Sequence, residues 1–342
     1  MVSWLEEHSA RKLLGCGPSA RLLNSRLIYP RYIRRCATKI EELFKADTTL
    51  RALICPQSQL AVSVMELLKT RRRVNYVTWI MDDHVVYNEN GRWTYPSGFR
   101  ETWAKHLRGA SKIFVISAEL GQFYRREFGV ESEVLFGPAD PVGEPIWVAP
   151  NSGDICRLGY FGSLWSWQVD ALTRLARYLS SLNATLDIFT NFQELPLELQ
   201  VSGVSMRRPV GRADVIHEMR KYDAVVLPIG FLESHRQLTE FNIATKMSEC
   251  LASGTITLVI GPQNAAMVRH LAPTGAACLT TAGDLAELHT AIGNLKHENY
   301  RREVLNRARK LVQLELSTSI MHARWMAAVY QLADLNNAPV NL

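Results

Sequence analysis

The chain lacks the features that mark several classes of protein. Its six cysteines form no CxxC pair, which argues against a zinc site and favours a reducing compartment. Its longest apolar runs, such as TITLVIG at 255–261, are strand-sized and fall well short of the ~18 residues of a membrane span. The first residues, MVSWLEEHSARK, lack the apolar core of a signal peptide. These absences predict a globular protein of the cytoplasm.

Positive charge is concentrated near the N-terminus. The net charge is +6, and residues 1–45 hold nine Lys or Arg against four Glu. Such a patch either attracts phosphate-bearing partners and the anionic inner face of a membrane, or is only the solvated face of a helix. The sequence leaves both interpretations open, and the first would make the protein peripheral at the inner face of the membrane. We expect no nucleic-acid partner.

Short predicted strands alternate with amphipathic helices from residue 51 onward. In the first half, the predicted strands are 52–56, 74–81, 112–117 and 132–137, and the predicted helices are 59–70, 98–110 and 119–129. Alternation of this kind indicates βαβ units around a parallel sheet. Residues 1–50 fit the pattern less well, so the N-terminal domain is predicted to be Rossmann-like but reduced.

The alternation restarts after residues 138–154, a segment rich in proline and glycine that is the best linker candidate. The predicted strands of this half are 156–163, 185–190, 205–210, 223–230, 255–261 and 276–281, and the predicted helices are 169–182, 212–222, 242–253 and 264–272. This pattern predicts a second doubly wound α/β domain.

The length of 342 residues also favours two domains. The predicted organisation is an N-terminal domain over 1–140, a linker over 141–154, a C-terminal domain over 155–315 and a final segment over 316–342. That segment contains a predicted helix at 321–335, expected to pack back on the first domain. The predicted fold class is therefore α/β, with two Rossmann-like domains facing each other across a cleft.

Gly15, Gly17 and Ala20 have the GxGxxA spacing of a dinucleotide-binding loop. That loop needs a buried strand directly before it, and the preceding residues here are EEHSARK. A glycine-bearing turn that leads into a helix around ATKIEELFKA is the favoured interpretation. We expect no cofactor.

The stretch NIATKMSECLASG at 242–254 combines an apolar helix face with a polar side. Asn242, Lys246 and Glu249 share that side by helical spacing. Asn242 is a good N-cap residue, and Gly254 ends the helix at the expected C′ position. We therefore predict that the helix begins at Asn242 and opens on the cleft.

A helix start in that position could bind a nucleotide diphosphate. The N–H groups of Ile243, Ala244 and Thr245 would hold the diphosphate with the help of the helix dipole. Glu249 would accept hydrogen bonds from a ribose, and Lys246 would neutralise phosphate charge. The alternative interpretation is a Lys246–Glu249 surface ion pair.

Four segments, in order, resemble the donor-binding domain of retaining GT-B glycosyltransferases, in particular the large family four group. They are RLGYFGSL (157–164), RPVGRADVIHEMRKYDAVVLP (208–228), NIATKMSECLASG (242–254) and TITLVIG (255–261). The resemblance extends over roughly residues 110 to 315, with a looser match in TWIMDDHVV and VISAELGQFYRREFGV. It implies a glycosyltransferase that uses a nucleotide-diphospho-sugar.

The resemblance also implies roles for single residues. Glu249 corresponds to the second acid of the family's E-x7-E motif, which binds the ribose. The first acid falls at position 241, which is Phe241 here, and Glu240 beside it is the candidate substitute. His84 follows a predicted strand where the family has a histidine near the anomeric carbon, with Asp82 and Asp83 as competing candidates.

Further donor contacts follow from the glycine loop and from the base-binding segment. Gly162 and Ser163 belong to the loop, and Val210 lies where the family's backbone meets the base. The Arg and Lys that normally follow the loop are replaced by Trp165, Trp167 and Gln168. Other cations would therefore meet the diphosphate, and the candidates are Lys246, Arg208, Arg212 and Arg236.

The implied reaction transfers a sugar to an acceptor hydroxyl with retention of configuration. The sequence has no DxD-type acidic pair in a suitable donor loop, so we expect metal-independent chemistry with fixed N–H donors and cations stabilising the leaving diphosphate. The acceptor would be a glycan or a lipid-linked glycan in polysaccharide biosynthesis. Two alternatives are a non-catalytic nucleotide-sugar or glycan-binding protein and a nucleotide-sugar epimerase on the same scaffold.

Overall fold

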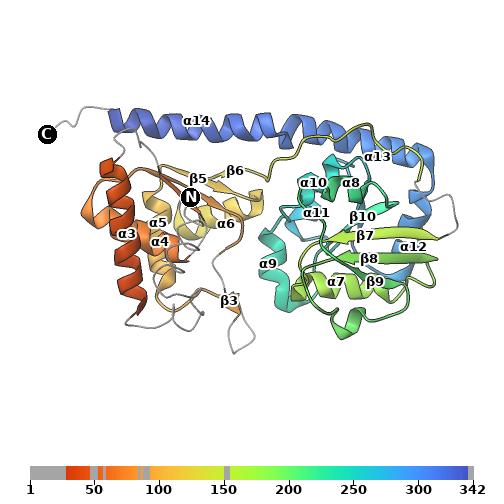
Figure 1. The fold of residues 1–342 in the computed structure, drawn as a ribbon. Coiled ribbons are helices and arrows are strands. Elements are labelled where there is room, and N and C mark those ends of the chain that lie inside the picture. The colour runs from red at the N-terminus through yellow and green to blue at the C-terminus, as the bar shows by residue number, and fades with distance from the viewer. Residues whose placement is uncertain are drawn as a thin grey trace. The chain divides into compact units, whose positions relative to one another are not determined.

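The computed structural model describes residues 28–46, 53–56, 59–83, 86–87, 93–149 and 155–337. The chain divides into two compact units. Unit 1 comprises Met1–Leu135 and Ala323–Leu342, and unit 2 comprises Phe136–His322. Figure 1 traces the chain through both, and each unit is considered by itself below.

Unit 1 contains a parallel four-stranded sheet in the order β1-β2-β5-β6. Its strands are β1 (Leu53–Pro56), β2 (Tyr76–Ile80), β5 (Lys112–Val115) and β6 (Glu133–Val134). The helices are α3 (Ile28–Ala46), α4 (Gln59–Arg71), α5 (Phe99–Gly109) and α6 (Ala118–Phe128). The strands and helices predicted between residues 52 and 137 are confirmed to within a few residues.

A small antiparallel hairpin of β3 (Val86–Tyr87) and β4 (Trp93–Thr94) was not expected from the sequence. It follows β2 in the chain, and no strand was predicted between residues 81 and 112. Two-residue strands are too short to show an alternating apolar pattern, so periodicity has no signal for them.

Unit 2 contains six parallel strands in the order β12-β11-β10-β7-β8-β9. The strands are β7 (Cys156–Phe161), β8 (Ala184–Phe189), β9 (Val204–Arg207), β10 (Ala224–Pro228), β11 (Ile256–Ile260) and β12 (Cys278–Thr280). Numbered by appearance, this order reads 3-2-1-4-5-6, which is the doubly wound order of dinucleotide-binding domains. The predicted parallel sheet of the second half is confirmed.

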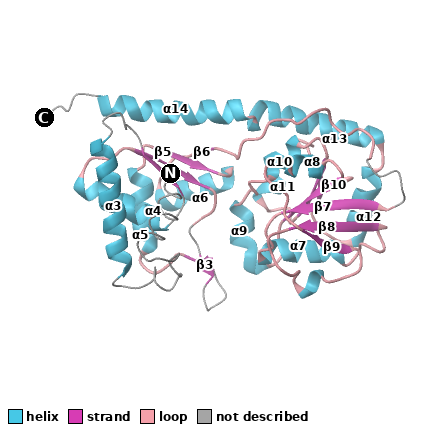
Figure 2. Cartoon of the chain, in the orientation of Figure 1, coloured by secondary structure: helices cyan, strands magenta, loops and turns pink. Residues whose placement is uncertain are grey.

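Helices cover the sheet of unit 2, as Figure 2 shows in cyan around the magenta strands. They are α7 (Ser166–Ala176), α8 (Val215–Met219), α9 (Arg236–Phe241), α10 (Met247–Ala252), α11 (Ala266–Leu271), α12 (Leu285–Leu295) and α13 (Glu298–Leu311). One large core joins α7, α12 and α13 to alternate residues of the strands, such as Leu158, Leu186 and Leu258. Alternation places every second strand residue on that face.

The segment predicted as a linker is tied to unit 2 in its described part. The Arg220 guanidinium donates to the carbonyl oxygens of Val142 at 2.9 Å and Glu144 at 2.8 Å. Arg301, which is fully buried, donates to the Ile146 oxygen at 3.0 Å. Because each guanidinium donates to several carbonyl groups, residues 142–146 are held by hydrogen bonds within unit 2.

The final helix, α14 (Thr318–Asn337), starts in unit 2 and continues into unit 1. Within unit 1, the Trp325 ring lies 5.7 Å from the Phe114 ring and 6.2 Å from the Trp79 ring, measured between centroids. Among the described residues, no helix combines the length and the apolar character that a membrane span requires.

Candidate functional site

The strand order of unit 2 defines one place where a ligand is favoured. β7 and β10 are neighbours, yet the chain winds outward from β7 through β8 and from β10 through β11. In open α/β sheets, the crevice outside the carboxyl ends of the strands at such a switch point is the usual ligand site. Gly162 directly follows β7, and Gly230 follows β10 after one intervening residue.

Both glycines lie in close-packed surroundings. A Cβ atom on Gly162 would lie 2.7 Å from the Tyr160 hydroxyl oxygen, and one on Gly230 would lie 3.0 Å from the Trp167 carbonyl oxygen. The Gly162 N–H donates to the Phe189 oxygen at 3.0 Å. The two loops at the switch point are therefore closely packed, Gly162 against the Tyr160 side chain and Gly230 against the Trp167 backbone.

The start of α7 is fastened to the loop after β10. Ser166 Oγ lies 3.1 Å from His235 Nε2. The Asp170 carboxylate accepts hydrogen bonds from the backbone N–H groups of Phe231 and Leu232, the latter at 3.1 Å. Burial lowers the pKa of His235, although the nearby Asp170 charge opposes that effect, so the imidazole is neutral at pH 7.

The helix predicted to begin at Asn242 does not begin there. Asn242 is extended, with φ −92° and ψ 137°, and it ends α9 by donating its N–H to the Leu238 oxygen at 3.0 Å. The next helix, α10, starts at Met247. Ile243, which lies between the two helices, is buried.

This correction changes what Ile243, Ala244 and Thr245 present. They form a connection between α9 and α10, with Ala244 and Thr245 exposed. Lys246 Nζ lies 3.2 Å from Glu249 Oε2, so the ion pair that the sequence left as an alternative is present. Asn242 Oδ1 is buried and has no hydrogen-bond partner among the described residues.

Comparison with known proteins rests on structure. No family model matches the chain, and no curated protein matches it by sequence. The sucrose-phosphate synthase of Thermosynechococcus elongatus superposes with a TM-score of 0.70 at 13% identity, covering 91% of this chain and 80% of its own. A glycosyltransferase from Rickettsia africae ESF-5 gives 0.62 at 13% identity, covering 93% and 84%. Anabaena HepE, solved with UDP and glucose, gives 0.63 at 13% identity, covering 88% and 82%.

The fold is GT-B. These structural neighbours are GT-B glycosyltransferases, and the two Rossmann-like units match theirs over most of each chain. The predicted fold class is therefore confirmed. At this level of identity the likeness establishes the fold alone, and the roles of single residues rest on the geometry of this chain.

Within the GT-B fold, Glu240 lies on α9 and is engaged by neighbours. Its Oε1 atom accepts from Arg236 Nε at 2.9 Å and from Asn264 Nδ2 at 3.2 Å. Asn264 follows β11, so Glu240 lies near the carboxyl edge of the sheet. Arg236, predicted as a phosphate ligand, also pairs with Glu233 at 3.2 Å. The carboxylates of Glu233 and Glu240 therefore already neutralise the Arg236 charge.

The predicted base-binding segment lies beyond the end of β9. The strand predicted over 205–210 ends at Arg207, so Arg208 and Val210 belong to the loop that follows. Arg208 and Arg212 are exposed, and neither forms an ion pair within the described part of the chain. They remain cations that could meet a phosphate, and the predicted roles stay predictions.

Of the catalytic candidates predicted in unit 1, the structure describes Asp82 and Asp83, whereas His84 lies outside the described residues. Asp83, just before it, is buried and accepts from the hydroxyls of Tyr95 at 2.8 Å and Tyr124 at 2.7 Å. Burial raises the pKa of Tyr124, and the Asp83 charge adds to that shift. Asp83 therefore acts as an acceptor that fastens its loop, which favours a structural role over catalysis.

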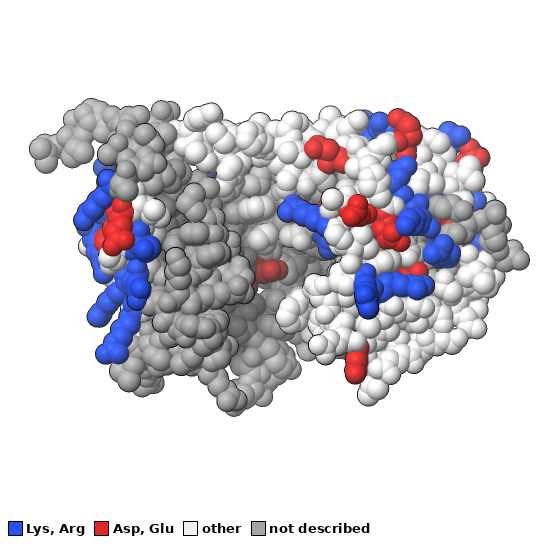
Figure 3. All heavy atoms as spheres, in the orientation of Figure 1, with Lys and Arg blue, Asp and Glu red and all other residues white. Residues whose placement is uncertain are grey.

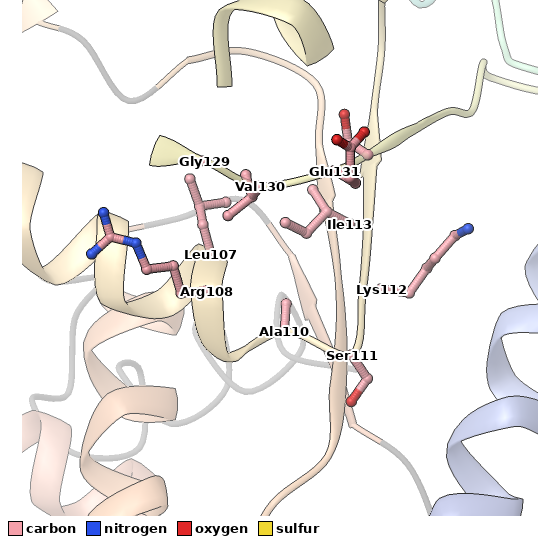
Figure 4. Close-up of a pocket in the computed structure, with 10 residues that line it drawn as sticks. Leu107, Arg108, Ala110, Ser111, Lys112, Ile113, Gly129, Val130 and Glu131 are labelled. Atoms are coloured by element: carbon pink, nitrogen blue, oxygen red, sulfur yellow. The ribbon is translucent and has the colours of Figure 1, made fainter. Parts of the chain in front are cut away.

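A pocket of about 420 Å³ in unit 1 lies away from the expected ligand edge. It is lined by residues at the end of α5, the start of β5 and the end of α6. Figure 4 shows the apolar side chains of Leu107, Ile113 and Val130 together there, with the Arg108 and Lys112 heads pointing apart. It opens at the amino end of β5, and parallel sheets bind ligands at the carboxyl ends, so we do not assign it to substrate.

Sequence reasoning missed three residues of the switch point: Ser166, Asp170 and His235. None belongs to a recognisable motif, because the contacts join α7 to a loop more than 60 residues later. A polar residue in the first turns of a helix after a glycine loop was the only available signal, and it is weak.

Proposed function

We propose that the protein is a glycosyltransferase that moves a hexose from a nucleotide-diphospho-sugar to an acceptor hydroxyl. The observation that supports it is the GT-B fold, with a switch point in unit 2 that has a closely packed glycine on each side and hydrogen bonds between α7 and the loop after β10. The structural neighbours are glycosyltransferases, and one was solved with UDP and glucose. The proposed acceptor is a glycan or a lipid-linked glycan.

In this proposal the donor lies along the carboxyl edge of the sheet in unit 2. Gly162 and Ser163 line the diphosphate from β7, and the connection 242–246 lines it from the side of β10. Glu249 receives the ribose, which requires its contact with Lys246 to open. The exposed fractions of these side chains, 39% for Lys246 and 25% for Glu249, leave both accessible to a ligand.

The orphaned amide of Asn242 fits the same site. A buried oxygen without a partner carries a desolvation cost until something donates to it. Hydroxyl groups of a ribose or a hexose are donors of that kind. Asn242 thereby joins the ligand set through its side chain, although it is not the helix cap that its sequence context predicts.

The reaction we propose breaks the anomeric C–O bond while negative charge builds on the leaving diphosphate. Backbone N–H groups and the cations Lys246, Arg208 and Arg212 stabilise that charge without a metal. Retention of configuration places the acceptor hydroxyl on the face of the leaving phosphate, which takes up its proton. His84 and Glu240 remain the proposed catalytic residues.

A membrane-proximal acceptor would suit the basic face of unit 1. Lys and Arg spheres gather along α3 in Figure 3, and Arg31, Arg34, Arg35 and Lys39 are exposed there. The other face of α3 packs on α4 through Tyr32, Cys36 and Ile40. We propose that this face contacts anionic lipid at the inner side of the membrane, where the enzyme is peripheral.

The test begins with thermal shift over UDP-, GDP- and ADP-sugars, because a ligand that binds only the folded state raises the midpoint. The variant Glu249→Ala should weaken nucleotide binding roughly tenfold or more, since it removes a charged hydrogen-bond acceptor for the ribose. The control Glu298→Ala breaks an exposed ion pair with Arg302 and should leave binding unchanged. An unaltered dissociation constant in Glu249→Ala would remove the ribose assignment.

Transfer assays then separate catalysis from binding. Turnover that requires an acceptor supports a transferase. Binding without turnover would indicate a non-catalytic protein, and interconversion of sugars without any acceptor would indicate an epimerase.

A further inference from the structure

Two tryptophans stand at the amino end of α7, directly after the glycine loop of the switch point. The Trp165 and Trp167 rings are stacked, with centroids 6.1 Å apart and planes 15° apart. Trp165 is 57% exposed, while Trp167 is half-buried. Trp167 therefore packs against Trp165, and the Trp165 ring stays accessible to a ligand.

The backbone beneath this pair is rigid. The N–H groups of Gln168 and Val169 donate to the Trp165 oxygen at 2.9 and 3.0 Å. Gly230 packs so closely on Trp167 that a Cβ there would contact its backbone at 3.0 Å. Ser166, which lies between the two tryptophans in the sequence, has its Oγ 3.1 Å from His235 Nε2. A binding surface held this way loses little conformational entropy when a ligand arrives.

The chemistry of the loop favours a neutral ligand group with a flat apolar side. Residues 162–168, GSLWSWQ, carry no charge. The same residues include two serine hydroxyls and the Gln168 amide. A sugar ring has the same character, because one face carries C–H groups and its edge carries hydroxyls. An aromatic ring that covers the C–H face removes apolar surface from water on both partners.

We propose that Trp165 is the platform for the sugar ring of the donor, an inference that rests on the proposed function. A nucleobase is also flat and neutral, but its predicted contact, Val210, follows β9. That strand lies two positions from β7 in the sheet, roughly 10 Å away at the usual strand spacing. If the base lies near β9, the part of the donor near β7 is the sugar, and Trp165 would contact it.

The experiment measures calorimetric dissociation constants of the full-length protein for UDP, GDP and ADP and for their glucose conjugates. Trp165→Ala should weaken the nucleotide-sugar about two- to tenfold and leave the nucleoside diphosphate unchanged. Trp165→Phe keeps an aromatic face and should retain most of the affinity. Phe192→Ala removes another exposed aromatic side chain of unit 2 and serves as the matched control.

The outcomes are distinct. Equal losses for the diphosphate and its sugar conjugate would mean that Trp165 holds the base, and unchanged constants for both would mean that it holds no part of the donor. If Trp165→Ala raised only the KM for the acceptor in the transfer assay, the ring would belong to the acceptor site. Each of these overturns the proposal while the proposed function stands. If the unmodified protein binds none of the nucleotides or conjugates, the proposed function fails and the platform fails with it.

Discussion

His106 shows how a single buried residue can make unit 1 sensitive to pH. Its side chain is fully buried; its ring stacks on Trp103 with centroids 5.4 Å apart, and the tilted Tyr76 ring lies 4.8 Å away. Burial lowers the pKa of His106, although Glu66, whose Oε1 lies 3.7 Å from Nδ1, opposes the shift. Lys69, which pairs with Glu66 at 2.8 Å, adds repulsion.

The stability of unit 1 should therefore fall on acidification. The unfolded chain protonates this histidine near pH 6.5 and the folded chain only at lower pH, so the unfolded state binds more protons as the pH falls through that range. Stability is complete above about pH 6.5 and declines below it by up to about 1.4 kcal/mol per pH unit. His106→Phe keeps the stacking and should flatten the decline between about pH 6.5 and 5.5, measured by urea unfolding.

The control is His289→Gln, which replaces an exposed histidine. It should leave the dependence of the unfolding free energy on pH unchanged. A slope that His106→Phe leaves intact would mean that another group carries the pH dependence.

At the scale of elements, the loop after β10 depends on α7 for its shape. Asp170 accepts two consecutive backbone N–H groups of that loop, and its carboxylate lies 3.8 Å from Arg174. The same loop carries His235, which bonds to Ser166. Two elements are thus fixed to each other at the switch point, and that fixing holds both the glycines and the Trp165 platform in place.

Asp170→Ala should lower the free energy of unfolding of unit 2 by about 1–3 kcal/mol, because it leaves backbone N–H groups without an acceptor. Chemical denaturation measures this change. Asp214→Ala removes an exposed aspartate that makes no capping hydrogen bond on α8, and it should stay within about 0.5 kcal/mol of the parent protein. Equal effects of the two changes would contradict the role assigned to Asp170.

At the scale of the whole molecule, unit 1 is completed by the far end of the chain. The chain passes between the units after Leu135 and again after His322. The part of α14 beyond that second passage lies on unit 1, where Trp325 contacts Trp79 and Phe114 and Arg324 donates to the Val134 oxygen at 3.5 Å. The last helix therefore contributes side chains to the packing of unit 1.

Trp325→Ala should destabilise unit 1 by about 2–3 kcal/mol, since it removes a large aromatic side chain from a partly buried position. Hydrogen exchange should show faster exchange in β2 and β5 and little change in the strands of unit 2. Tyr330→Ala, on the same helix at 63% exposure, provides the comparison and should leave both units unaffected. Exchange that rises equally in both units would show that the two unfold as one.

The local patterns of the sequence were sufficient for the elements of the fold. Apolar runs such as ITLVI and helical spacing in 169–182 predicted parallel α/β architecture, because burial on a sheet imposes those periods. They failed at Asn242, which ends α9 instead of starting a helix, because the bounds of α9 and α10 depend on packing that a single residue's capping preference does not record. They also failed at the hairpin β3–β4, which is too short to carry a period.

The sequence by itself determined that the chain forms two α/β units and that 242–254 is a polar-faced segment beside a buried strand. Only the tertiary structure decided that β7 and β10 are neighbours, that His235 reaches Ser166, and that Trp165 stands exposed above the glycine loop. The physical reason is range: periodicity and capping act within a few residues, whereas strand order and the packing of loops depend on contacts between segments far apart in the chain.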